Sequence, residues 1–468
     1  MRAERQQETE AGRQAAERLE YAEEATGDAL PPGAGPGAWT AFDRSVRELQ
    51  RSWNPGNHLA LRLCHPDGRI RESALNAPHP PPPLVAIRCA DWVPAVRERA
   101  RLLLDQALAD DLPGTLGALT PLVLRLARRE QGAWARERFE AAIRDAGAVP
   151  AVLRDSADLP TRRFAARLSL ESGGFGVREL ARRAAAEHDP ATSRLWTDAA
   201  LAVMAADGPD DETIDTLLGA RIPMVRAAGV TALRGAGRAA EAGDHLADRS
   251  GLVRACARWL VRQAGGDPYA RYRELVEDPA RVTPYAVTGF AECARRADLP
   301  LLRALVEHPT GAVRAAAVGG LRLLDSTDHE LLRPLLDDPW PAVAREVSLS
   351  LRSTAGRLPA EWLAARTAPE RPVHTRRAAY RLLQAQGGAA WLRAAVELQT
   401  DGDPGLRRLA AQHIQGLWPT YGPICLPARD PEVGALLDRC TGLASGYAIR
   451  WMRSQLGIPR AKSTTDGY

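Results

Sequence analysis

The sequence predicts an all-α protein, an α-solenoid of stacked helix pairs, and three observations support this fold class. A short motif returns at intervals of about 31 residues between residues 162 and 407. Its copies carry apolar residues at the spacing of an amphipathic helix. Runs of alternating β-branched residues, which would indicate a sheet, do not occur in the chain.

The ends of the chain differ in character from its body. Residues 1–24 contain four Arg and seven Glu and predict a polar, charged N-terminal helix with little apolar surface to bury. Residues 25–37 form a Pro/Gly linker that we expect to be flexible. Short apolar helical patterns broken by Asp, Pro and Gly fill residues 38–459, the predicted solenoid, and residues 460–468 are expected to be a disordered tail.

The repeated motif is a turn followed by Val-Arg and a run of small apolar residues. Clear copies are PMVRAAGVTALR from Pro223, GLVRACARWLVR from Gly251 and GAVRAAAVGGLR from Gly311. The residues aligned with the Arg of this step, called register residues below, are Arg162, Arg194, Arg226, Arg254, Thr288, Arg314, Ala344, Arg376 and Arg407. Earlier copies place Arg71 and Arg97 in the same role.

Each copy predicts two antiparallel helices. In one unit, residues 299–308 form a first helix, a turn ends at Gly311, and residues 312–324 form a second helix. Its apolar stripe contains Ala and Gly, which allow neighbouring helices to approach closely. Asp-Pro turns such as Asp403-Pro404 combine a helix cap with a residue suited to the first helical turn.

An acidic turn followed by V-R-x-x-A-x-x-x-L in units of about 30 residues resembles HEAT repeats. The variety it resembles most is the short type named for phycobilisome lyases. The resemblance covers residues 55–455 and implies 12–13 repeats, with Thr288 and Ala344 departing from the pattern. It also implies a solenoid that binds other macromolecules, more often without catalysis than with it.

Composition excludes several classes of function. The chain has 62 Lys+Arg against 58 Asp+Glu, and all but Lys462 of the basic residues are arginine. With no lysine in the body of the chain, Walker-A ATPases, protein kinases and Schiff-base enzymes lack their amine. The abundance of Arg, Ala, Gly and Pro indicates a bacterial protein. No apolar segment is long enough for a membrane span or a secretory signal, so we expect a cytoplasmic protein without a membrane partner.

Cysteine and histidine spacing predicts no metal site, no cofactor and no catalytic residue. His65 and His188 each lie near an Asp, but both lie at turns where an Asp is expected to cap a helix. Cys64 and Cys89 occupy matched positions in adjacent repeats, roughly 10 Å apart by helix packing. This separation exceeds the reach of a disulfide, and we predict free thiols.

Arginines also recur nine residues after the aligned Val of successive motifs. This arginine column consists of Arg234, Arg262, Arg296, Arg322 and Arg352. It is either a ladder for phosphates or an acidic partner, or a set of cations that favour the C-terminal ends of helices. The register arginines Arg226, Arg254 and Arg314 are instead predicted to pair with acidic turn residues between repeats.

The sequence therefore favours a non-catalytic scaffold that binds another protein through a concave surface. Binding of nucleic acid or another polyanion through the arginine column is the alternative. A third interpretation is an enzyme, lyase-like or similar to the HEAT-like DNA glycosylases that hold an alkylated base with Asp and Trp, for which Asp91-Trp92 would be the candidates. Charge alone suggests that the acidic N-terminal segment covers a basic groove. The identity of the partner is not encoded in these patterns.

Overall fold

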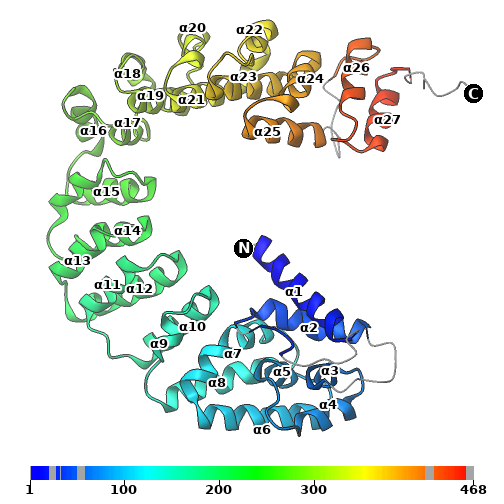
Figure 1. The fold of residues 1–468 in the computed structure, drawn as a ribbon. Coiled ribbons are helices and arrows are strands. Elements are labelled where there is room, and N and C mark those ends of the chain that lie inside the picture. The colour runs from blue at the N-terminus through cyan, green and yellow to red at the C-terminus, as the bar shows by residue number, and fades with distance from the viewer. Residues whose placement is uncertain (1, 21–27, 32, 50–57, 417–425, 460–468) are drawn as a thin grey trace, which may run out of the picture. The chain divides into compact units, whose positions relative to one another are not determined.

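The computed structural model describes residues 2–20, 28–31, 33–49, 58–416 and 426–459 (Figure 1). Within these residues the regular elements are helices, apart from one isolated bridge between Thr441 and Ala444. The predicted all-α class is confirmed. The helices gather in two compact units, unit 1 at Met1–Gly237 and unit 2 at Arg238–Tyr468.

Unit 1 contains the helices up to α14. They are α1 (Arg2–Glu20), α2 (Pro36–Leu49), α3 (Leu59–Cys64), α4 (Gly68–Leu75), α5 (Pro82–Arg88), α6 (Pro94–Asp110), α7 (Leu112–Leu126), α8 (Ala133–Asp145), α9 (Ala151–Arg154), α10 (Leu159–Ser172), α11 (Val177–Ala186), α12 (Pro190–Asp207), α13 (Asp211–Leu218) and α14 (Pro223–Ala232).

Unit 2 contains the remaining α-helices and five 3₁₀ segments. They are η1 (Ala239–His245), α15 (Gly251–Gln263), α16 (Pro268–Glu277), α17 (Pro284–Ala291), η2 (Arg296–Asp298), α18 (Leu299–Leu305), α19 (Gly311–Leu323), α20 (His329–Leu332), η3 (Pro334–Asp337), α21 (Pro341–Leu351), η4 (Arg352–Arg357), α22 (Ala360–Ala364), α23 (Val373–Gln386), α24 (Gly388–Glu397), η5 (Leu398–Thr400), α25 (Pro404–Gln415), α26 (Pro431–Arg439) and α27 (Gly446–Gln455).

The helices of unit 2 stack in pairs. The second helices α17, α19, α21 and α23 pack successively against one another, and the first helices α16, α18, α20 and α22 lie along the other side (Figure 1). The unit expected at residues 299–324 is the pair α18 and α19, and Val313, Ala317 and Leu321 of its stripe are buried. This stacking confirms the predicted α-solenoid architecture.

The register arginines fasten each turn to the helix that follows it. Nη1 of Arg71, Arg226 and Arg314 donates to the carbonyl oxygens five and six residues earlier, at distances of 2.7–3.0 Å. Arg162 and Arg407 form the same pair of bonds. These carbonyl groups end the preceding helix or turn, where a helix offers no partner of its own. Two of the arginines predicted to be structural, Arg226 and Arg314, therefore hold their own turns.

The same guanidinium groups also reach the next repeat. Arg314 donates from Nε and Nη2 to the two carboxylate oxygens of Asp338, both at 2.8 Å. Asp338 Oδ1 in turn accepts the backbone N–H of Trp340 at the start of α21. Arg254 pairs with Glu292, and Arg71 pairs with Asp91. One arginine therefore joins its own turn to the turn of its neighbour.

One of the two repeats without a register arginine, the repeat of Ala344, uses a different side chain. At Ala344, the carbonyl six residues earlier is that of Asp338, and His374 Nε2 from α23 lies 3.0 Å from it. The bond to the turn is thus supplied by the following repeat. Because His374 replaces the missing arginine at this carbonyl group, the stack of helices continues through the repeat of Ala344.

In unit 1 the register arginine Arg71 and its carboxylate partner Asp91 belong to a buried ionic cluster. Asp91 accepts bonds from Arg71 at 2.8 and 2.9 Å, from Arg88 at 3.1 Å and from the Val93 N–H at 3.0 Å. Arg88 also pairs with Asp43 of α2. Burial opposes ionisation of Asp43, but the charges of Arg88 and Arg47 outweigh it and lower the pKa of this carboxyl. The cluster joins α2, α4 and α5.

The cysteines agree with the proposed register. Cys64 and Cys89 are buried free thiols, as predicted. Burial raises the pKa of Cys64 well above its usual range, and the nearby Asp43 carboxylate adds to the shift. Burial likewise raises the pKa of Cys89 to about 12. Both thiols therefore act as small apolar side chains.

The prediction that the N-terminal helix has little to bury is wrong. Ala15, Ala16 and Leu19 of α1 are buried, and α1 packs along α2. A Cβ atom at Gly12 would lie 2.2 Å from the carbonyl oxygen of Ala38, so the absence of a side chain permits this close crossing. A helix that is polar on average still buries one narrow stripe of small residues.

The predicted linker and tail lie partly or wholly outside the described residues. Helix α2 begins at Pro36, inside the linker expected at residues 25–37. Residues 21–27 and 32 of the predicted helix and linker are outside the described part, as is the tail at 460–468.

We expect Asp91→Asn to lower the free energy of unfolding of unit 1 by about 3–5 kcal/mol, because it leaves buried guanidinium groups without their counter-charge. Urea denaturation followed by circular dichroism and tryptophan fluorescence would measure it. Glu10→Gln, which removes an exposed ion pair with Arg13, is the control and should leave the midpoint nearly unchanged. Equal midpoints for both variants would contradict the structural role of the cluster.

We expect Gly12→Ala to separate α1 from α2, because the added Cβ meets backbone rather than a movable side chain. Limited trypsin digestion should then cleave at Arg13 and Arg18 several-fold faster than in the unchanged protein. Ala11→Ser, at the exposed neighbouring position, is the matched control. Unchanged cleavage in Gly12→Ala would show that α1 is not held by this crossing.

Candidate anion-binding site

An arginine-lined cavity lies on the second-helix side of unit 2. Its volume is about 320 Å³. The residues that line this anion cavity are Arg345, Ser348, Leu349, Arg352, Arg381, Gln384 and His413. They come from α21, the start of η4, α23 and α25, so three successive repeats build the site. No carboxylate is among the lining residues.

The guanidinium groups around the cavity are only partly neutralised. Arg345 shares Glu346 with Arg322, at 3.1 and 3.0 Å, and Arg377 lies 3.4 Å from Asp403. Within the described residues, neither Arg352 nor Arg381 forms an ion pair. Unpaired cations at one cavity repel each other, and an anion placed between them would remove this repulsion.

The neighbouring charges act on the pKa of Arg381. Burial, together with the charges of Arg377, Arg345 and Arg352, lowers the pKa of this guanidinium below its ordinary value. Its ordinary pKa is so high that the group stays charged at neutral pH. The cavity therefore holds a positive charge that the protein itself does not compensate.

His413 closes one side of the cavity. Its ring stacks on Tyr380 with centroids 5.5 Å apart, and Nδ1 lies 3.2 Å from the Tyr380 hydroxyl oxygen. Burial and the charges of Arg381 and Arg352 lower the pKa of His413 from its ordinary value of 6.5. The imidazole is consequently neutral at pH 7.

A second cavity of about 710 Å³ adjoins the anion cavity and shares Leu349, Arg352 and Gln384 with it. Its other lining residues are Arg322, Asp325, Thr327, Ser350, Ser353 and Ala385. The hydroxyl of Ser350 is buried and has no hydrogen-bond partner. This hydroxyl cavity is therefore polar, and one of its groups lacks a partner within the protein.

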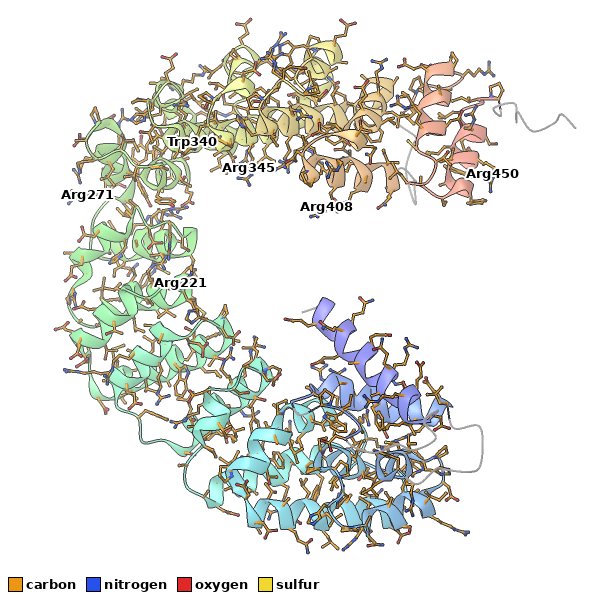
Figure 2. The ribbon with its side chains drawn as sticks, viewed as in Figure 1. Arg221, Arg271, Trp340, Arg345, Arg408 and Arg450 are labelled. Atoms are coloured by element: carbon orange, nitrogen blue, oxygen red, sulfur yellow. The ribbon has the colours of Figure 1, made fainter. Side chains whose placement is uncertain are left out.

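The repeat pattern accounts for the position of Arg345, one of the arginines that line the anion cavity. The residue directly after the register residue is Ala in three repeats, at Ala227, Ala255 and Ala315. In three later, successive repeats it is Arg345, Arg377 and Arg408. Figure 2 shows Arg345 and Arg408 projecting to the same side of unit 2. The change from Ala to Arg at one repeat position was visible in the sequence but was not used in predicting the site.

The five arginines of the predicted column occupy different positions in the structure. Arg322 and Arg352 line the same cavity, so these two are brought together. Arg262 and Arg322 lie in the last turns of α15 and α19. Arg234, Arg296 and Arg352 lie beyond the ends of α14, α17 and α21, because those helices are shorter than the repeat pattern implied. Arg234 belongs to unit 1 and the others to unit 2.

The other candidate residues have structural partners. Both carboxylate oxygens of Asp91 are engaged in the buried cluster. His65 Nδ1 accepts the N–H of Asp67, whose carboxylate caps α4. Asp189, next to His188, caps α12 and pairs with Arg163, and the bonds from Arg163 lower the pKa of its carboxyl. We find no general-base geometry at either histidine.

The described residues contain neither a cluster of metal ligands nor a membrane-spanning helix. No group of three or more His, Cys, Asp or Glu side chains is arranged to hold a metal ion there. No helix in this part of the chain has both the length and the apolar character needed to cross a bilayer.

No protein-family model matches the chain, and no curated protein sequence matches it. A crystal structure of importin beta in a polyethylene glycol condition is similar over 97% of this chain and 68% of that chain, with 11% identity and a TM-score of 0.30. An engineered protein is similar over 70% of this chain and 97% of its own, with 16% identity and a TM-score of 0.19. The fold class accordingly rests on the helix pairs described above, and the HEAT assignment stays a prediction from the sequence.

We expect unit 2 to lose stability as the pH falls below 6.5, because the unfolded state protonates His413 before the folded state does. The loss continues until the lowered pKa of the folded protein is reached. His413→Gln should reduce the difference between the urea midpoints at pH 7.5 and pH 5.5. His188→Gln, an exposed histidine change in unit 1, is the control. An unchanged pH difference in His413→Gln would contradict the burial of a neutral imidazole beside Arg381 and Arg352.

Proposed function

We propose that the protein is a non-catalytic helical-repeat scaffold that binds a partner protein, and that an acidic segment of the partner docks at the anion cavity of unit 2. The observation that carries this proposal is the pair Arg352 and Arg381, which face one cavity without a carboxylate partner. Guanidinium groups in this state favour bidentate bonds to carboxylate or phosphate oxygens.

The proposal includes the class of repeat and the cellular compartment. HEAT repeats of the short type, a bacterial origin and a cytoplasmic location are supported by the sequence patterns alone. Absence of catalysis is likewise a proposal, supported by the engagement of Asp91 in structural bonds rather than at a cavity. Successive second helices are spaced regularly, so equivalent side chains recur along the stack. A surface of this kind is suited to binding an extended partner.

A polyanion such as nucleic acid is the second candidate. It is favoured by Arg322 and Arg352, two members of the arginine column that line one cavity. However, Arg322 is already paired with Glu346, and neither cavity is lined by Phe, Tyr or Trp in the described part of the chain. Single-stranded nucleic acids are typically held by stacking on such rings.

The double variant Arg352→Gln/Arg381→Gln should reduce capture of the partner from a lysate of the native host by at least about tenfold, the effect of losing one charge-assisted contact. Quantitative mass spectrometry of the captured proteins would measure it. Arg271→Gln, which removes an arginine of α16 paired with Glu274, is the matched control and should capture normally.

Two outcomes would contradict the proposed function. Equal capture by the double variant and the unchanged protein would place the interface elsewhere. Capture that disappears after nuclease treatment would show that the ligand of this face is nucleic acid.

A further inference from the structure

The anion cavity carries more positive charge than one carboxylate can neutralise. Arg352 and Arg381 have no ion pair among the described residues, and Arg345 shares its single carboxylate with Arg322. A carboxylate has one negative charge and two oxygens. A phosphate monoester has a charge of about −1.5 to −2 at pH 7 and three strong acceptor oxygens.

We propose that the anion cavity binds a phosphate monoester, carried by a phosphorylated serine or threonine of the partner protein. This inference rests on the proposed function and specifies the chemistry of the ligand. The donors for the three oxygens are the guanidinium groups of Arg345, Arg352 and Arg381, which surround one space of about 320 Å³.

Neutral donors complete the site. The side chains of Gln384 and His413 line the same cavity, and the Gln384 amide carries N–H donors. Hydrogen bonds from several directions distinguish a tetrahedral group from a planar carboxylate. A bound dianion would also stabilise the imidazolium form, so occupation of the cavity raises the pKa of His413.

The hydroxyl cavity provides room for the chain that carries the phosphate. It shares Arg352 and Gln384 with the anion cavity, so a residue phosphorylated at its side chain can place its backbone there. The Ser350 hydroxyl is buried and unpartnered, and a peptide carbonyl or N–H would satisfy it. Free phosphate would leave this group without a partner, which favours a phosphorylated peptide as the ligand.

Three capped tripeptides and two reference ligands test the proposal in the full-length protein by isothermal titration calorimetry. The tripeptides are Ala-Xaa-Ala with phosphoserine, glutamate or serine at the centre, and the references are inorganic phosphate and a ten-residue oligothymidylate. We expect the phosphoserine peptide to bind at least about tenfold more tightly than each of the other four ligands.

Substitutions locate the site. Arg352→Gln and Arg381→Gln should each weaken binding of the phosphoserine peptide by roughly tenfold, whereas Arg271→Gln should not. Ser350→Ala should weaken the peptide but leave inorganic phosphate unchanged. Circular dichroism of each variant checks folding, and nuclear magnetic resonance of labelled histidine should show the pKa of His413 rising when the peptide is added.

Any one of the following results would overturn the proposal. Equal binding of the glutamate peptide assigns the site to carboxylates, and tighter binding of the oligothymidylate assigns it to nucleic acid. If inorganic phosphate binds as tightly as the phosphoserine peptide, the hydroxyl cavity does not contribute to binding. If capture of the partner requires Arg352 and Arg381 but survives phosphatase treatment of the lysate, the scaffold function stands and the phosphate inference is wrong.

Discussion

The clamp that a register arginine such as Arg314 forms between two turns is the interaction on which the stack of repeats depends. Arg314 joins the carbonyl groups of its own turn to the carboxylate of Asp338, which in turn accepts the backbone N–H of Trp340 at the start of the next second helix. The planar guanidinium can make these bonds in several directions at once, whereas a lysine ammonium is a compact point charge. The near absence of lysine therefore suits the architecture.

A fixed clamp has a consequence for function, because it keeps a constant offset between residues of successive second helices. The position after the register residue is occupied by Ala in several repeats and by Arg345, Arg377 and Arg408 in three successive ones. Of these three arginines, Arg345 lines the anion cavity, whereas Arg377 pairs with Asp403. The constant offset thus places one arginine of this repeat position at the candidate site, together with Arg352 and Arg381 from other positions of the repeat.

The repeat pattern predicted the second helices, the free thiols and the pairing of Arg254 and Arg314 with acidic residues of the next repeat, because each of these depends on local spacing. Patterns of this kind could not reveal the docking of α1, which depends on a backbone crossing at Gly12, or the pairing of Arg88 with Asp43, which lie 45 residues apart. The arginine column failed in part for a related reason. Helix ends vary by several residues between repeats, so equal offsets beyond a helix end do not give equal positions.

Among so many arginines, the informative property is the lack of an internal partner rather than the number or spacing of the residues. Arg322 is neutralised by Glu346 and Arg377 by Asp403, so these two charges are already satisfied within the protein. Arg352 differs because α21 ends at Leu351 and η4 begins with it, where both cavities meet. Arg381, one helix further on, faces the same space. Two side chains whose charges remain uncompensated therefore define where an anion gains most from binding, and only the three-dimensional structure shows that they share one cavity.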